Sequence, residues 1–443
     1  MLFRKLSPRT TQRALSIAGL TAAWPLLLVW STAALATEAY FQNGIGARNK
    51  ALAGAGVASS TDATAVSLNP AGLVNVESQA DVALSFMHLD GGFTTWGTGG
   101  LDPDGHHDST AHWAYIPNLA ATWRVNWGLV DAIAFSAYGN GGVNTHYKDL
   151  ANPGCGGLTG VFCGGPLGIK LSQTFLSVAF AKQIMPGISI GVAPIVARQT
   201  GEVDGVGLFA PLSSDAANFS NRGRDESWGG GVRAGIEWKA TPGLTIGVAG
   251  NSRIEMSNFD RYRGLLAEQG DFDIPASVQA GVAVSLTPSM TLMADYKHIW
   301  FNSVASAANP STNLGLFAFG TANGPGYGVQ NVDVLKVGLE WRSSPALTLR
   351  AGYSYNSQPH LSRDADLNIM TLGVVQQHIT GGAKYKLTER WDVEFAAMYA
   401  PRNSITGTEL GAAQRNVEIE NSEFEFTVGA VYRFGNREPA PLK

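Results

Sequence analysis

Residues 424–434 read FEFTVGAVYRF, and side chains of similar character recur there at every second position. One set is apolar or aromatic and comprises Phe424, Phe426, Val428, Ala430, Tyr432 and Phe434. The intervening set comprises Glu425, Thr427, Gly429, Val431 and Arg433. Because successive side chains of a pleated strand point to opposite faces, this period of two predicts a strand with one apolar and one more polar face.

The same alternation recurs upstream, for example over 347–355 and 391–399. Counting segments between turn-like breaks gives about fourteen strands, joined alternately by short turns and long polar loops, as in bacterial outer-membrane barrels. The expected strands run over 79–90, 112–124, 128–139, 170–184, 187–200, 226–240, 243–256, 273–287, 290–302, 331–343, 346–357, 373–388, 390–401 and 422–434. We therefore expect an all-β fold, an antiparallel transmembrane β-barrel of about fourteen strands.

Composition agrees with a barrel in a membrane. Charged residues make up 15% of the 443 residues, below the roughly 25% of a soluble domain. The mean hydropathy is only +0.01, which is low for a bundle of membrane helices. No apolar run after residue 36 approaches the roughly 20 residues that a spanning helix needs. The formal net charge of −4 gives no indication of nucleic-acid binding.

The N-terminus has the features of an export signal. Basic residues between positions 4 and 13 precede an apolar stretch over 14–30, and Ala34-Leu35-Ala36 fits a small-x-small cleavage site. A retained anchor helix is the alternative. We expect four parts: a signal peptide over 1–36, an N-terminal segment over 37–78, the barrel over 79–436 and a periplasmic tail over 437–443.

Residues 37–78 lack the strand pattern. Small residues dominate them, and Asn69-Pro70-Ala71 ends one of several short helical turns. The segment is too short to bury a core of its own. We expect it to pack inside the barrel lumen.

The chain resembles the FadL family of outer-membrane transporters of long-chain fatty acids and other hydrophobic compounds. Asn69-Pro70-Ala71 looks like the motif of the family's N-terminal hatch, and Ser136-Ala137-Tyr138-Gly139 looks like the end of its third strand. Residues 274–277 and 347–353 are further matches, and the resemblance covers essentially the whole mature chain. It implies a barrel plugged by the hatch, with external ligand capture, a pocket in the lumen and sideways exit through the wall.

The resemblance also implies roles for single residues. Phe41 would reach into the ligand pocket, although simple anchoring of the N-terminus is an alternative. An inward kink of the third strand would open a lateral gate, and an ordinary strand end is the alternative. The residues of that kink are Tyr138, Gly139, Gly141 and Gly142. Phe434 would act as the terminal aromatic residue that the barrel-assembly machinery recognises.

Two expected loops, 201–225 and 257–272, carry apolar residues toward water, which usually marks a binding site. The candidate ligand-binding residues are Phe209, Leu212, Phe219, Phe259, Tyr262, Leu265 and Leu266. Arg222, Arg224, Arg261 and Arg263 lie among them and could pair with a fatty-acid carboxylate. Alternatively, the apolar residues pack the loops together and the arginines contact lipopolysaccharide.

Other motifs give weaker signals. Cys155 and Cys163 are the only cysteines, and in an exported protein we expect a disulfide that closes a loop. The stretch over 102–108, DPDGHHD, contains carboxylates and imidazoles but matches no calcium loop, and a solvated loop is the simpler interpretation. No metal site or cofactor is expected. Neither a Gly-x-Ser-x-Gly nor a His-Glu-x-x-His motif is present.

These observations predict a monomeric barrel in the outer membrane of a Gram-negative bacterium, surrounded by lipid and lipopolysaccharide. It would be a transporter and not an enzyme, taking up hydrophobic molecules passively, long-chain fatty acids first among them. Aromatic-hydrocarbon uptake within the same family is the main alternative. A general porin and an outer-membrane lipid hydrolase are more distant ones.

Overall fold

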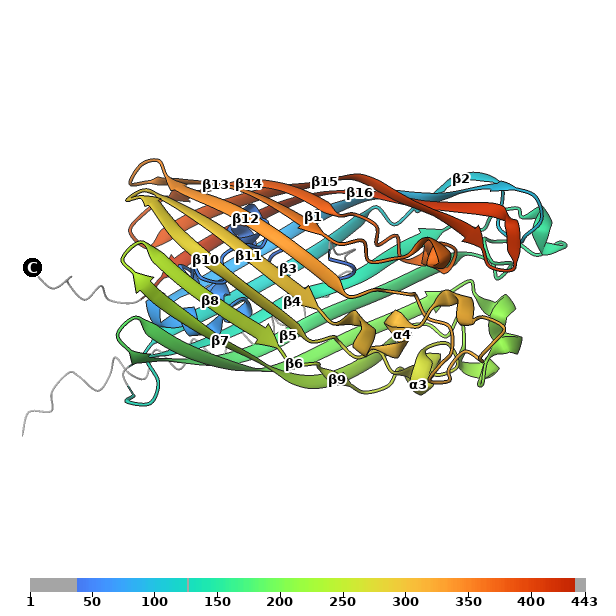
Figure 1. Ribbon diagram of the computed structural model, residues 1–443, viewed down its shortest axis with the longest axis horizontal. Helices are drawn as coiled ribbons and strands as arrows, with labels where there is room; N and C mark the ends of the chain where they lie inside the picture. The colour runs from blue at the N-terminus through green and yellow to red at the C-terminus, as the bar shows by residue number, and fades with distance from the viewer. Residues whose placement is uncertain (1–37, 126, 435–443) are drawn as a thin grey trace, which may run out of the picture. The chain divides into compact units, whose positions relative to one another are not determined.

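The structure, a computed structural model, describes residues 38–125 and 127–434 (Figure 1). The predicted signal peptide over 1–36 and the predicted tail over 437–443 lie outside the described residues.

The described strands form one antiparallel sheet that closes on itself, since β1 pairs with β16. Of its 16 strands, β2 (Gly105–Asp108) pairs only with β1 and β9 (Glu255–Met256) only with β7, which leaves fourteen in the closed wall. The wall strands are β1 (Gln79–Gly97), β3 (Trp113–Arg124), β4 (Ala132–Tyr147), β5 (Leu167–Met185), β6 (Ile188–Asp204), β7 (Asp225–Thr241), β8 (Leu244–Asn251), β10 (Ser277–Thr287), β11 (Met290–Ile299), β12 (Val332–Arg342), β13 (Leu347–Asn356), β14 (Gln377–Lys386), β15 (Trp391–Glu409) and β16 (Ala412–Arg433). The predicted fold class and strand number are confirmed.

Short helices interrupt the remaining segments. Three belong to the N-terminal segment: α2 (Gly46–Ala51), η2 (Ala63–Ser67) and η3 (Pro70–Asn75). The others lie in the loops and are η4 (Pro153–Cys155), η5 (Gly207–Leu212), η6 (Ala216–Asn218), η7 (Asp260–Tyr262), α3 (Ala267–Gly270), η8 (Phe301–Ser303), α4 (Ala305–Ala308), η9 (Ser311–Asn313), η10 (Ser362–Asp364) and η11 (Leu367–Met370). Within the part of the chain that the structure describes, no helix is long and apolar enough to cross a membrane.

The alternation of β16 sorts its side chains between lipid and lumen. Phe424 and Phe426 are 49% and 40% exposed on the outer face, whereas Glu425 and Thr427 are 4% and 1% exposed on the inner face. An apolar exterior and a polar interior are the arrangement that a lipid environment selects.

Several strands extend beyond the range that alternation predicted. The segment 402–421 was expected to be a loop, but β15 and β16 continue through it to a tight turn at Gly411. Val417 and Ile419 are fully buried there, whereas Glu418 and Glu420, on the opposite face of the strand, are partly exposed. Apolar side chains therefore point inward in this part, opposite to the membrane-facing part of the same strand. Water outside and packed loops inside explain this reversal.

Similar extensions occur elsewhere. The expected loop over 91–111 contains the end of β1 and the whole of β2, and β4 and β5 lengthen into the expected loop over 140–169. Long outer extensions of the wall thus replace part of the predicted loops.

The N-terminal segment packs inside the barrel, as predicted for a hatch (Figure 1). Its helix α2 contacts β14 and β15, and η3 contacts β5, β6 and β7. Val66 and Leu73 are fully buried against small wall residues such as Ala134 and Ala179. Small side chains on both partners allow this close approach.

Candidate functional site

The hatch motif joins the hatch to the wall. Asn69 is fully buried, and its side-chain amide donates to the carbonyl oxygen of Val57 at 2.8 Å and to that of Ile236, in β7, at 3.1 Å. Its side-chain oxygen accepts from the Ala71 amide at 3.1 Å and so caps η3, whose first residue is Pro70. One side chain therefore orders the hatch turn and attaches it to the barrel.

Two wall glycines make room for this motif. A Cβ atom on Gly235 would lie 2.1 Å from the Asn69 side-chain oxygen, and one on Gly191 would lie 2.3 Å from the Pro70 carbonyl carbon. A larger residue would displace the Asn69 side chain at Gly235 and the hatch backbone at Gly191. The wall sequence is thus matched to the hatch.

Buried ion pairs also attach the hatch to the barrel wall. Arg48 of the hatch lies 2.9 Å from Glu340, which also pairs with Arg350 at 2.9 Å. Arg350 in turn reaches Glu394 at 3.0 Å. Positive and negative side chains alternate in this series, so each of these buried charges has a partner of opposite sign.

A cavity of about 60 Å³ lies in the lumen beside the hatch and is lined by an excess of cations. Phe41 and the side chains of Arg233, Lys297 and Lys336 contribute to its lining. An engineered cavity that binds benzene has about 150 Å³. A hydrophobic ligand therefore enters this lumen only if neighbouring groups move.

The two lysines share one carboxylate. Glu38 is fully buried and pairs with Lys297 at 2.6 Å and with Lys336 at 2.5 Å. Lys336 also donates to the Asn43 carbonyl oxygen at 2.8 Å. Lys297 lies over the ring of Phe41, 5.7 Å from its centroid.

Arg233 has neutral partners. Its guanidinium donates to the side-chain oxygen of Asn251 at 2.7 Å, to the Tyr138 hydroxyl at 3.0 Å and to the Val66 carbonyl at 3.3 Å. No carboxylate within the described residues forms an ion pair with it. The residue is only 5% exposed. Three cations therefore line the cavity, and no carboxylate is among its lining residues.

The wall is interrupted next to this cavity. Pairing between β3 and β4 ends at Asn118 opposite Tyr138, although β3 continues to pair with β1 as far as Trp113. Pro117, which lacks an amide hydrogen, lies where the next pairs would form. Beyond this point, β4 has no β3 partner.

The N-terminal segment occupies the free edge of β4. β4 bulges between Gly139 and Gly141. The backbone N–H of Gln42 donates to the Asn140 carbonyl at 3.1 Å, and the backbone N–H of Gly142 donates to the Tyr40 carbonyl at 3.0 Å. A Cβ atom on Gly141 would lie 1.9 Å from the Tyr40 carbonyl oxygen, so only glycine fits. The four residues expected at the kink thus lie where the wall opens and the hatch segment covers the opening.

A second cavity, of about 20 Å³ and almost wholly apolar, lies between the loops. The predicted residues Phe209, Phe219, Leu265 and Leu266 line it. Two further loops complete the lining with residues that were not predicted from the sequence, namely Ser306, Phe319, Pro325, Gly326, Tyr327, Leu367 and Met370. Phe319 joins the loops because its ring centroid lies 5.2 Å from that of Phe219 and 6.3 Å from that of Phe209.

The other three apolar candidates lie outside this lining. Leu212 is 44% exposed on the loop surface. Phe259 and Tyr262 are buried, and the Tyr262 hydroxyl accepts from the Val203 amide and donates to the Gly223 carbonyl. These contacts hold the loop conformation.

None of the four candidate arginines lines the loop cavity. Arg222 and Arg224 are exposed, as are Arg261 and Arg263. Arg261 donates to the Arg222 carbonyl, and Arg263 pairs with Asp215. Their position on the outer surface suits contact with anionic groups outside the protein better than contact with a ligand in the cavity.

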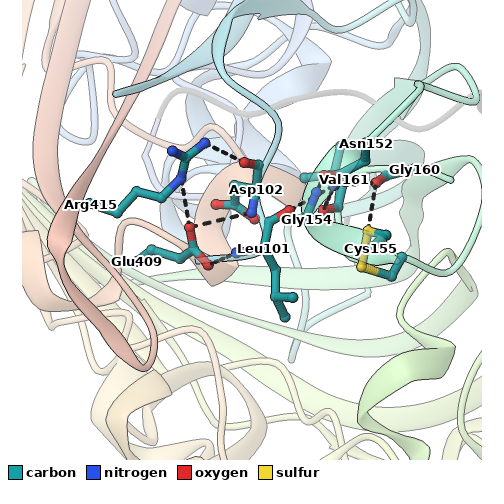
Figure 2. Close-up of a disulfide and its surroundings, with 10 residues drawn as sticks. Leu101, Asp102, Asn152, Gly154, Cys155, Gly160, Val161, Glu409 and Arg415 are labelled. Atoms are coloured by element: carbon teal, nitrogen blue, oxygen red, sulfur yellow. Dashed lines mark hydrogen bonds and ion pairs between the residues drawn. A yellow bond between two sulfur atoms is a disulfide. The ribbon is translucent and has the colours of Figure 1, made fainter. Parts of the chain in front are cut away.

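The disulfide loop packs against the segment that contains Leu101 and Asp102 (Figure 2). Cys155 and Cys163 are bonded, with Cα atoms 5.3 Å apart. Asn152 donates to the carbonyl oxygens of Leu101, Gly160 and Val161. Figure 2 shows Leu101 and Asp102 between the disulfide loop and the pair formed by Arg415 and Glu409.

The DPDGHHD stretch is more ordered than expected. Four of its residues form β2 on the extension of β1, and the ring of His106 lies 2.8 Å from the Asp108 carboxylate on the surface. Asp102 is only 3% exposed, so the interpretation as a fully solvated loop is wrong at this residue. Burial and the nearby Asp366 and Glu409 raise the pKa of Asp102 well above its usual value. No group of metal-binding side chains is found within the described residues.

A family model described as outer membrane protein transport protein (OMPP1/FadL/TodX) matches residues 26–434. The chain belongs to this family. The OMPP1/FadL/TodX family consists of transport channels, and the chain is accordingly a transporter of hydrophobic compounds in the outer membrane of a Gram-negative bacterium. No curated protein sequence matches it.

Solved structures of FadL/TodX transporters share its fold. A Pseudomonas aeruginosa FadL homologue aligns with a TM-score of 0.68 and 16% identity, over 89% of this chain and 100% of that one. The Pseudomonas putida toluene transporter TodX gives 0.65 and 16% over the same shares. The Ralstonia pickettii toluene transporter TbuX gives 0.57 and 16%, over 89% and 99%.

Proposed function

We propose that this transporter carries long-chain fatty acids, and that the lumen cavity receives their carboxylate. The cations that line this cavity carry the proposal. A buried cation is costly unless an anion or a full set of hydrogen bonds compensates it. A carboxylate would pair with Arg233, Lys297 or Lys336, whereas toluene offers no charge to any of them.

The two cavities suggest a sequence of steps. The apolar loop cavity would capture the hydrocarbon chain from outside, because burying apolar surface is favourable and requires no directional contact. The lumen cavity would then take the head group. The interruption between β3 and β4 would let the ligand leave sideways into the membrane. Transport by this route is passive, and any conformational change is driven by differential ligand binding.

A substitution at Gly139 tests the lateral exit separately from ligand binding. A Cβ atom there would lie 2.9 Å from the Ile116 side chain of β3, so Gly139→Val would fill the interruption. We expect slower oleate uptake with unchanged equilibrium binding. Normal uptake by a correctly folded Gly139→Val protein would refute the lateral exit.

Aromatic-hydrocarbon uptake is the competing proposal, and the purely apolar loop cavity favours it. TodX and TbuX, two of the similar structures, are named toluene transporters. Cells that depend on this protein for uptake would be given radiolabelled oleate and, separately, radiolabelled toluene. Saturable oleate uptake that falls at least tenfold in Lys297→Met supports the fatty-acid proposal. Saturable uptake of toluene alone would replace it with the alternative.

We also propose how the protein interacts with lipopolysaccharide and with the barrel-assembly machinery. The exposed arginines would contact lipopolysaccharide phosphates, and the protein would act as a monomer. Phe434 donates its amide to the Ser78 carbonyl at 3.1 Å and packs against Trp123 and Tyr432, which fits a terminal residue presented for barrel assembly.

A further inference from the structure

The carboxylate of Glu38 occupies the position between lumen lysines at which a ligand carboxylate would bind. It is fully buried, and its two oxygen atoms lie on two different lysines of the lumen, Lys297 in β11 and Lys336 in β12. Both lysines also line the cavity. A fatty-acid head group that enters the cavity therefore meets cations whose anion is already part of the chain.

The same short segment closes the wall. Glu38 and Phe41 form a turn through two reciprocal backbone hydrogen bonds of 3.0 and 3.2 Å. Tyr40, within this turn, and Gln42, directly after it, form backbone hydrogen bonds with Gly142 and Asn140 at the free edge of β4. Segment 38–42 therefore forms the ion pairs with the lysines at its first residue. Only a few residues later, it pairs with β4 and covers the opening in the wall.

The turn combines a strained backbone with a buried charge. Ala39 has φ 63°, a left-handed conformation that non-glycine residues rarely adopt. The buried Glu38 has no cationic partner other than the two lysines in the described residues. Loss of those ion pairs leaves the Glu38 carboxylate buried without a cation, which is unfavourable inside the lumen.

We propose that Glu38 is an internal counter-ion that a ligand carboxylate replaces on Lys297 and Lys336, and that this exchange frees segment 38–42 from the edge of β4. Glu38 is then a specificity-determining residue. An acid satisfies both lysines as Glu38 leaves, whereas a neutral hydrophobic molecule leaves them without an anion. The exchange also enlarges the cavity, which is too small for a hydrocarbon chain while the segment is in place. This inference rests on the proposed function, since it requires an acidic ligand in the lumen.

The test uses the purified full-length mature protein and two probes with the same hydrocarbon chain, oleate and oleyl alcohol. Hydrogen exchange is measured in peptides that contain residues 38–45 and 139–145, alongside equilibrium binding. We expect oleate to increase exchange in both peptides at least tenfold and oleyl alcohol to leave it unchanged. This comparison needs no substitution.

A variant pair sharpens the result. In Glu38→Gln, exchange should already be fast without ligand, and oleate should bind at least tenfold more tightly because no internal carboxylate competes. Glu423→Gln is the matched control, because Glu423 is a lumen carboxylate that accepts from Asn421 and forms no ion pair within the described residues. It should resemble the wild-type protein in both measurements.

Saturable oleate binding with unchanged exchange in segment 38–42 would overturn the counter-ion exchange and leave the proposed function standing. The same holds if Glu38→Gln binds oleate no more tightly than the wild-type protein. Absence of saturable oleate binding would overturn both proposals.

Discussion

Replacing Asn69 with alanine is expected to loosen the hatch without disturbing the barrel. The side chain is fully buried and makes three hydrogen bonds, two to carbonyl oxygens and one to the Ala71 amide. One of the carbonyls belongs to the wall residue Ile236, so the substitution breaks a direct link between hatch and barrel. Wall pairing itself does not depend on Asn69.

The cost follows from those contacts. A buried hydrogen bond contributes about 1 kcal/mol net, and an N-cap residue also contributes about 1 kcal/mol. Loss of all three contacts should destabilise the seated hatch by about 3 kcal/mol. Because each 1.4 kcal/mol is roughly a factor of ten, the unseated population should rise about 100-fold.

Single-channel recording in planar bilayers would detect this change, since an unseated hatch opens a water path through the lumen. Asn69→Ala should show brief large-conductance openings about 100-fold more often than the wild-type protein. Asn69→Ser is the matched control: it retains a capping oxygen but lacks the amide group that reaches Val57 and Ile236, and should give an intermediate frequency. An unchanged opening frequency in a folded Asn69→Ala protein would refute the proposed role of Asn69 in attaching the hatch to the wall.

Three further predictions concern the loops. Phe209→Ala combined with Leu265→Ala should weaken oleate binding about tenfold by removing apolar surface from the loop cavity, and unchanged affinity in equilibrium binding would exclude that cavity as a capture site. Cys155→Ser should increase protease cleavage within residues 151–165 while the barrel keeps its melting temperature, and a lower barrel melting temperature would contradict a purely local role. Burial raises the pKa of Asp366 from its usual 3.8 to about 6. The folded loops therefore favour the protonated form, so this contribution to loop stability is complete below about pH 4 and is lost as the pH rises through about 6. A spin label at Thr98 should become mobile over that range, and the same transition in Asp366→Asn would show that another group is responsible.

The barrel wall was predictable because a lipid environment acts on every second residue. Phe424 and Phe426 must face hydrocarbon and Glu425 cannot, so local sequence suffices to recognise the strand. Above the membrane this rule reverses. Val417 and Ile419 point inward there, and a run of alternating polar residues was mistaken for a loop.

The candidate site was less predictable, because it depends on contacts between distant segments. Phe209 and Leu265 were found from apolar residues in polar loops, and the same signal in the loop over 303–330 could have drawn attention to Phe319 and Tyr327. Lys297 and Lys336 lie on wall strands, where alternation indicates only which side chains face the lumen. Their shared partner, Glu38, lies more than 250 positions away in the chain, and local sequence patterns contain no information about such a pairing.

An experimental structure of the protein with bound oleate tests the exchange of Glu38 for a ligand carboxylate most directly. We predict that the oleate carboxylate lies within hydrogen-bond distance of Lys297 and Lys336, with Glu38 displaced and the edge of β4 uncovered. Oleate confined to the loop cavity, or a lumen in which Glu38 still holds both lysines while oleate is bound, would contradict it.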